Sequence, residues 1–461
     1  MATTPLSGTT LAIVRRTHRT QEMLSLAKSD GCALCGNQTH KKNFWGTPEP
    51  LDIPGLVQNG NCIYPDCPGK RQPLKGQQAP TGNGNTSQKQ PLSPQTTQPS
   101  APTPNVPNQT TLQLSEKDSI NTILTTMEKN RRTASVQERG CAILGRLSHN
   151  EDNPKRTEIG SAGGIVRIVD GMQLHPRDEA VQRHGCFALR HLVICNDDNR
   201  RRVAQARGGV KMVIKAMTNH WSDELLLEHA VSVLVHLCAY HNEKNRKEAN
   251  KRSALIGNAG GVEAVINSMR LHPTVVPLLK YACMALRNLS CYNNDNRLRI
   301  AQAGGIEQIL HAMQQHPTAE GLLKPACATF KHLTMYNCGH RIRIAQAGGI
   351  ERILHTMREY PTAEGLLIEA CAALGNLCAN NDNNKRLIGK AGGIKVLVDT
   401  MKQNSTATNV QEEATFALFN LSLDSNNKNE IAKTATEAAK EAHRRFPSLQ
   451  FPPKVLKRLG R

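Results

Sequence analysis

A pair of adjacent glycines recurs six times in this 461-residue chain. Successive pairs are separated by 45, 52, 44, 44 and 44 residues. Each pair is followed by apolar residues at i, i+3, i+4 and i+7, which is the pattern of one helix face. Such a period is typical of an array that repeats one supersecondary unit. The pairs begin at Gly163, Gly208, Gly260, Gly304, Gly348 and Gly392.

The residues between the glycine pairs predict three helices in each unit. The helix that follows a pair often stops near a proline, which cannot continue it. A second apolar helix then ends in Ala-Leu-x-Asn-Leu at 285–289, 373–377 and 417–421. A polar loop and a short basic helix lead to the next pair, whose first glycine can cap that helix in the left-handed conformation. A seventh copy, without glycines, predicts an N-terminal cap at Ile120, Ile123, Leu124 and Met127.

This arrangement resembles the armadillo repeat family over about residues 115–445. The features that carry the resemblance are the short helix, the glycine, the second helix and a third helix that ends in Ala-Leu-x-Asn-Leu. The resemblance implies an all-α fold in which about seven repeats stack into a right-handed superhelical solenoid. It also implies a non-enzymatic scaffold or adaptor, because armadillo arrays serve in nuclear import, adhesion, signalling and attachment to membranes.

Composition divides the chain into five segments. Residues 1–29 are a basic stretch that we do not assign. Residues 30–70 contain four cysteines, and residues 71–110 are rich in Pro, Gln, Thr, Asn and Ser with few apolar side chains, which predicts a disordered linker. We expect the armadillo domain to span 111–445, and a basic tail to occupy 446–461.

The cysteines of residues 30–70 predict a small zinc module. Two pairs, Cys32 with Cys35 and Cys62 with Cys67, supply four thiolates, and His40 is an alternative ligand. The second pair is separated by four residues instead of the usual two. A module this small with so few apolar residues needs a staple to fold, which favours a structural Zn²⁺ over free thiols or a disulfide.

The resemblance also predicts where a partner binds. In armadillo proteins the third helices line a concave groove, and an Asn near the end of each one bonds the backbone of an extended peptide. Only three of seven equivalent positions keep the Asn. The Trp column of nuclear import adaptors is missing, which argues against lysine-rich import signals as ligands. The column reads Arg146, His191, His236, Asn288, His332, Asn376 and Asn420.

Basic residues beside this column predict an acidic ligand. Arg190, Arg287 and Lys331 each precede a column position, and Lys280 and Lys324 lie two turns earlier. Arg and Lys form charge-assisted hydrogen bonds with carboxylates and phosphates. An acidic or phosphorylated protein segment therefore suits the groove, unless these charges only keep an exposed face soluble.

Other periodic residues have simpler interpretations. The methionines at i+7 share the apolar face of their helices, and they are expected in the core. The histidines of the column lie on successive repeats, too far apart to share a zinc ion. Cysteines recur five residues before the column and are expected to be small core residues: Cys141, Cys186, Cys283, Cys327 and Cys371.

Charge and missing motifs limit the function further. The formal net charge of +20 favours acidic partners, and the alternative to a protein-binding scaffold is a nucleic-acid-associated or nuclear-transport-type adaptor. Aromatic residues make up only 3%, which leaves few platforms for base stacking. No phosphate-binding loop or nucleophile elbow is present, so we expect no enzymatic activity. We expect a cytoplasmic or nuclear protein without a membrane span, and the basic C-terminus could serve as a nuclear localisation signal.

Overall fold

A computed structural model gives the fold of the chain. It describes residues 114–149, 154–240 and 243–461, and two short strands. The strands, β1 (Val57–Gln58) and β2 (Asn61–Cys62), pair antiparallel. They and the helices belong to different compact units and are treated separately. The predicted zinc module and linker otherwise lie outside the described residues.

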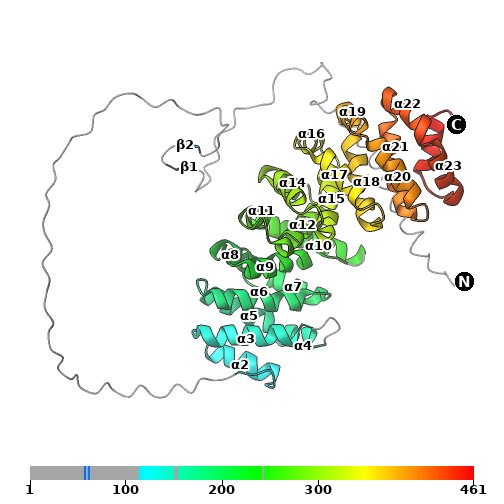
Figure 1. Cartoon of the computed structure of the whole chain (residues 1–461). Coiled ribbons are helices and arrows are strands. Elements are labelled where there is room, and N and C mark those ends of the chain that lie inside the picture. Colours follow the sequence, from blue (N-terminus) through cyan, green and yellow to red (C-terminus); the bar gives the residue numbers. More distant parts are fainter. Residues whose placement is uncertain (1–56, 59–60, 63–113, 150–153, 241–242) are drawn as a thin grey trace, which may run out of the picture. The chain divides into compact units, whose positions relative to one another are not determined.

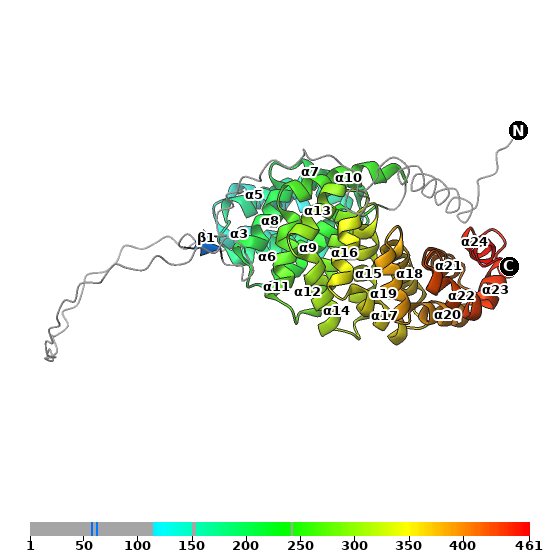
Figure 2. The ribbon, with the colours of Figure 1, turned by 90° about the horizontal axis from the view of Figure 1, so that it is seen from above.

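The helices confirm the predicted all-α solenoid, and they follow one another through space in chain order (Figures 1 and 2). They form three sets, with one member of each set per complete unit. The first helices are α4 (Lys155–Ser161), α7 (Asp197–Gln205), α10 (Glu243–Asn258), α13 (Asn294–Gln302), α16 (Cys338–Gln346), α19 (Asp382–Lys390) and α22 (Ser425–Thr434). The second helices are α2 (Ile120–Lys129), α5 (Gly164–Leu174), α8 (Gly209–Asn219), α11 (Gly261–Leu271), α14 (Gly305–Gln315), α17 (Gly349–Glu359), α20 (Gly393–Gln403) and α23 (Thr436–Arg445). The third helices are α3 (Ala134–Leu147), α6 (Glu179–Val193), α9 (Glu224–Leu237), α12 (Val276–Ser290), α15 (Glu320–Thr334), α18 (Glu364–Cys378), α21 (Thr408–Leu421) and α24 (Phe451–Arg458).

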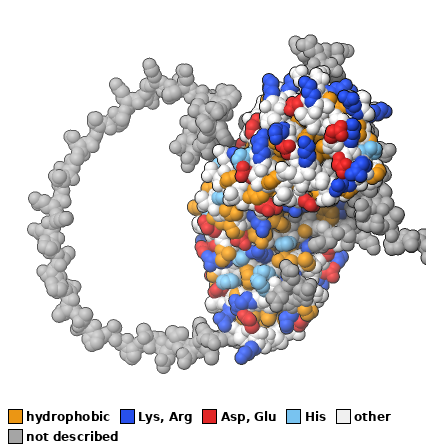
Figure 3. All heavy atoms as spheres, turned by 45° about the vertical axis from the view of Figure 1, so that its right-hand side comes forward, with side chains coloured by type: hydrophobic (Ala, Val, Ile, Leu, Met, Phe, Trp, Pro, Cys, Tyr) orange, Lys and Arg blue, Asp and Glu red, His pale blue; other side chains and the backbone are white. Residues whose placement is uncertain are grey.

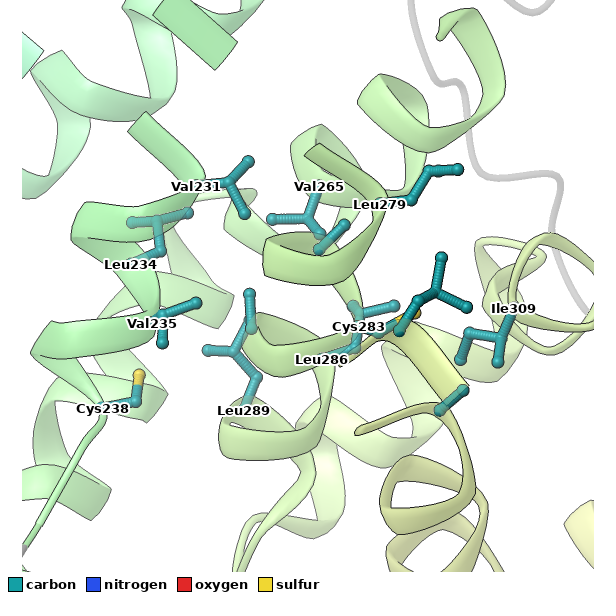
Figure 4. Packing of buried hydrophobic residues seen from close by; sticks show 14 of the residues in the cluster. Val231, Leu234, Val235, Cys238, Val265, Leu279, Cys283, Leu286, Leu289 and Ile309 are labelled. Carbon is teal, nitrogen blue, oxygen red and sulfur yellow. The ribbon is translucent and has the colours of Figure 1, made fainter. Parts of the chain in front are cut away.

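One continuous apolar core runs through the array. Figure 4 shows side chains from α9, α11, α12 and α14 gathered between the helices, with the thiol of Cys283 among them. The methionine column is buried, as predicted. The five periodic cysteines are buried too, and burial raises their pKa, for example to about 12 in Cys283. They are core residues that stay protonated at neutral pH.

The two glycines of each pair have different tasks. The first adopts the predicted left-handed conformation, with φ between 75° and 87° in all six pairs. The second is required by a close approach of the preceding first helix. A Cβ on Gly349 would lie 2.5 Å from Cγ2 and 2.7 Å from the carbonyl oxygen of Ile344. The pair is therefore a joint that sets how closely the first and second helices of a unit pack.

The predicted basic tail, residues 446–461, contains a folded helix. Residues 451–458 form α24, which packs on α21 and α23. Phe451 lies 4.9 Å from Phe416 between ring centroids, and Val455 is fully buried. With α22 and α23 this helix makes an eighth unit. The sequence pattern missed it because this unit has neither the glycine pair nor the Ala-Leu-x-Asn-Leu ending.

Within the described residues, no helix combines the length and the apolar character that crossing a membrane requires.

Candidate functional site

The third helices pack side by side along the array and form one surface, which we call the third-helix face. It is concave around α9, because side chains two units apart meet there. Nη2 of Arg190 on α6 donates to the hydroxyl of Tyr281 on α12 over 2.7 Å. Neighbouring helices are about 8 to 10 Å apart, so such a contact across α9 requires the flanking helices to turn toward each other.

The column residues form a ladder of hydrogen bonds between units. Nδ2 of Asn288 donates to the carbonyl of Val235 over 3.0 Å, and Nδ2 of Asn376 and of Asn420 donates in the same way to the carbonyls of Lys331 and Gly375. Nδ1 of His332 lies 3.0 Å from the carbonyl of Arg287. The asparagines thus use a side-chain N–H to join third helices. Their Oδ1 atoms have no donor within the described residues and are the groups left for a ligand.

The N-terminal part of the column differs. Arg146 is exposed and pairs with Glu116, whereas His236 is half-buried. His191 is buried, and its Nδ1 has no hydrogen-bond partner in the described part of the chain. Burial lowers the pKa of His191 to about 3, assisted by the nearby His149 and Arg190. His191 is therefore neutral at physiological pH and adds no charge to the face.

The buried histidine predicts a pH-dependent stability. The pKa of His191 is about 3 when folded and near 6.5 when unfolded, so the unfolded chain binds the extra proton. We expect the free energy of unfolding to fall below pH 6.5, by at most about 1.4 kcal/mol per pH unit from this group. Urea unfolding at pH 7, 6 and 5 should show a shallower decline for His191→Phe. The exposed His355→Phe is the control, and equal slopes in both variants would contradict the assignment.

Two predicted groove cations are already paired. Arg190 bonds Glu228 over 3.1 Å, and its guanidinium also lies over the ring of Tyr281. Lys331 bonds Glu369 over 2.8 Å, and both side chains are largely buried. In each case the carboxylate belongs to the next unit, 38 residues along the chain. These pairs stabilise contacts between units and do not present free charge.

Three other predicted groove cations differ from Arg190 and Lys331 in their ion pairing, namely Arg287, Lys280 and Lys324. All three are exposed, and none forms an ion pair with a carboxylate of the described residues. The residue 38 positions after Arg287 is the buried Pro325. At the same offset from Arg190 and from Lys331 the chain has a glutamate. The free positive charge at these positions therefore lies on α12 and α15. On the face drawn in Figure 3, Lys and Arg side chains are interspersed with Asp and Glu.

A second polar ladder, on the first helices, was not predicted from the sequence. In α16, Nε of Arg341 donates to the carbonyl of Thr334 and Nη1 to that of Ala379, over 3.0 and 2.9 Å. The residue before the arginine is an Asn in two units, and its Nδ2 bonds carbonyls of neighbouring helices. The buried cations are Arg156, Arg200, Arg252, Arg297, Arg341 and Lys385. Much of the basic character of the first helices thus serves structure.

A basic insert lengthens the unit before Gly260, where the glycine pairs are 52 residues apart, and part of it belongs to this ladder. The insert extends α10, and Arg246 lies over the ring of Tyr292 with 5.1 Å between Cζ and the ring centroid. Lys251 pairs with Glu248 over 2.8 Å. Arg252 is buried and donates to the carbonyl of Leu237, so it does not belong to a surface cluster.

These observations do not test the prediction of a zinc site. Cys32, Cys35, Cys67 and His40 lie outside the described residues, as does the side chain of Cys62. The described part contains no group of three or more His, Cys, Asp or Glu side chains placed to hold a metal ion. Structural zinc in residues 30–70 stays a prediction, which the zinc content of the purified chain would check.

Comparison with known families agrees with this geometry. The family model of the LRRK2 ARM repeat matches residues 166–450. The chain belongs to this armadillo-repeat family. An armadillo array is typically a protein-binding scaffold, and typically not an enzyme. A search of curated proteins finds no match.

Several solved structures are similar to this armadillo array. A crystal structure of an engineered protein, target OR329, is 20% identical, with a TM-score of 0.46 over 56% of this chain and 96% of that one. The designed armadillo repeat protein YIII(Dq)4CqI is 16% identical, with a TM-score of 0.46 over 56% of this chain and 100% of that one. A structure described under a phosphorylation switch between cadherin and beta-catenin is 17% identical. Its TM-score is 0.44, over 75% of this chain and 73% of that one.

Proposed function

We propose that the third-helix face binds an extended acidic protein segment, with Lys280, Arg287 and Lys324 as its main cations. The observation that carries the proposal is that all three are exposed on adjacent units, α12 and α15, and that none pairs with a carboxylate of the described residues. Other cations of the face, such as Arg190 and Lys331, are neutralised within the array. A carboxylate or phosphate from a ligand would complete the charge pairing with charge-assisted hydrogen bonds.

The ladder of asparagines supplies the complementary backbone contacts. Asn288, Asn376 and Asn420 each keep Oδ1 as an acceptor, which suits the N–H groups of an extended peptide. Asn288 lies on α12, the helix that carries Lys280 and Arg287. Backbone bonds then set the path of the ligand, and the three cations select for acidic side chains.

The test is capture of proteins from nuclease-treated cell extract by the full chain. We expect the charge-reversed variant Lys280→Glu, Arg287→Glu, Lys324→Glu to lose at least about tenfold in capture. The matched control reverses three exposed lysines of the second helices, Lys211, Lys215 and Lys402. It changes the net charge equally but leaves the third-helix face intact, so it should capture the same proteins as the wild type. Soluble polyglutamate should compete for this capture.

Two outcomes would overturn the proposal. Equal loss in both variants would show that only the overall charge matters. Capture from untreated extract that disappears after nuclease treatment would identify nucleic acid as the ligand, held through its phosphates with a steep dependence on salt.

A further inference from the structure

Two glycines of the third helices have no backbone reason to be glycine. Gly321 in α15 and Gly365 in α18 occupy the same position in successive units, 44 residues apart, and neither has a positive φ. Glycine in a helix is unfavourable relative to alanine because it loses more backbone freedom on folding. The equivalent positions of earlier units hold the side-chain-bearing residues Ala180, Leu225 and Pro277.

The space above each glycine is occupied by a lysine of the preceding unit. A Cβ on Gly365 would lie 2.6 Å from Nζ and 3.2 Å from Cε of Lys324. A Cβ on Gly321 would lie 3.5 Å from Cδ and 3.6 Å from Cε of Lys280. Both lysine side chains therefore extend along the array across a glycine. The position of Nζ in Lys324 is available only because residue 365 lacks a side chain.

We propose that these lysines form a two-point clamp, in which Gly365 positions Lys324, for acidic groups three residues apart in an extended ligand. This inference rests on the proposed function and adds the spacing of the ligand. Adjacent helices are roughly 8 to 10 Å apart, so equivalent ammonium groups repeat at about that distance. A polyproline II segment advances about 3.1 Å per residue with three residues per turn, so residues i and i+3 share one face about 9 Å apart. A β-strand presents residues i and i+2 on one face at about 6.7 Å, and i and i+4 at about 13 Å, neither of which matches.

The first test changes the glycines. We expect Gly365→Ala to weaken binding of an acidic peptide by about three- to tenfold, because the new methyl group displaces Nζ of Lys324. Gly321→Ala is the matched control, since its methyl group would make only ordinary contact with Lys280. Both substitutions should leave the melting temperature unchanged or raise it. Wild-type affinity in Gly365→Ala, or an equal loss in both variants, would overturn the positioning role.

The second test changes the ligand. Proline-rich 15-residue peptides carry four glutamates separated by two, three or four positions, at equal net charge, and fluorescence anisotropy measures their affinity for the full chain at low salt. We expect a spacing of three to bind best to the wild type, and Gly365→Ala to lose that preference. A parallel set carries phosphoserine at the same positions. The same preference for a spacing of three in this set would show that the clamp accepts phosphate as well as carboxylate.

These experiments separate the clamp from the function on which it rests. If all spacings bind equally and the Lys280→Glu, Arg287→Glu, Lys324→Glu variant loses binding, the acidic-ligand function stands and the clamp is wrong. If that charge-reversed variant binds every peptide as the wild type does, both are wrong.

Discussion

Gly349→Ala is expected to destabilise the array by about 2 to 4 kcal/mol, although it adds only one methyl group. The new Cβ would lie 2.5 Å from Cγ2 of Ile344 and 2.7 Å from its carbonyl oxygen. The oxygen belongs to the backbone of α16, so relief requires α16 and α17 to move apart. That movement would open the core around Ile344 and Ile350, which are both fully buried.

The neighbouring glycine provides the control for this substitution. Gly348 has a φ of 82°, and a Cβ added there would meet nothing within 4 Å, so this position is constrained by conformation and not by space. Gly348→Ala should therefore cost about 1 to 2 kcal/mol, and Gly348→Asn less, since Asn tolerates the left-handed region. Urea unfolding followed by circular dichroism measures all three. A smaller loss for Gly349→Ala than for Gly348→Ala would contradict the close-approach explanation.

The sequence predicts this part of the fold well because local physics determines it. The glycine pair sets the joint between two helices, and the apolar period sets which faces are buried. Both signals lie within a short stretch of chain, and both recur in six units. The C-terminal unit lacks them, and α24 is recognisable only from its packing on α21, through Phe451 and Val455.

The sequence predicts the charge of the candidate site less completely than the fold. Whether a basic side chain is neutralised depends on the carboxylates of neighbouring units. The sequence places Arg190, Arg287 and Lys331 at the same position before the column, yet of these three only Arg287 has no carboxylate partner within the described residues. The partners of the other two lie 38 residues along the chain, on the next third helix. Once the period of the repeats is known, the sequence itself contains the signal for these pairs, a glutamate 38 residues after the basic residue. The burial of His191 has no such signal, because it depends on how rings from two units pack against each other.

The second polar ladder, on the first helices, explains why the net charge of the chain overstates how much positive charge lies on the surface. The period was present in the sequence, as Asn199-Arg200, Asn296-Arg297 and Asn384-Lys385. These residues follow a polar loop and resemble a solvated basic helix, so the pattern did not indicate burial. In the structure each guanidinium lies at the C-terminal ends of third helices, where carbonyl groups and the helix dipole favour a cation.

The largest expected effect follows from removing one member of this ladder. Arg341→Met should destabilise the array by about 3 to 5 kcal/mol, because carbonyls at the ends of both α15 and α18 lose a charged donor while they stay buried. Methionine keeps much of the volume, so the loss reports hydrogen bonding and not a cavity. Arg341→Lys should lose less, since an ammonium group keeps the charge but cannot reach both carbonyls with the same geometry.

The control for this variant is the exposed Arg386→Met, which should change stability by less than about 0.5 kcal/mol. Hydrogen exchange locates the loss: units stabilise their neighbours, so protection should fall first in α15, α16 and α18 and then in adjacent helices. Added salt should change the difference between Arg341→Met and the wild type little, because screening is weak for buried groups. A strongly salt-dependent difference would mean that Arg341 acts as a surface charge, and the buried ladder would then not account for the basic first helices.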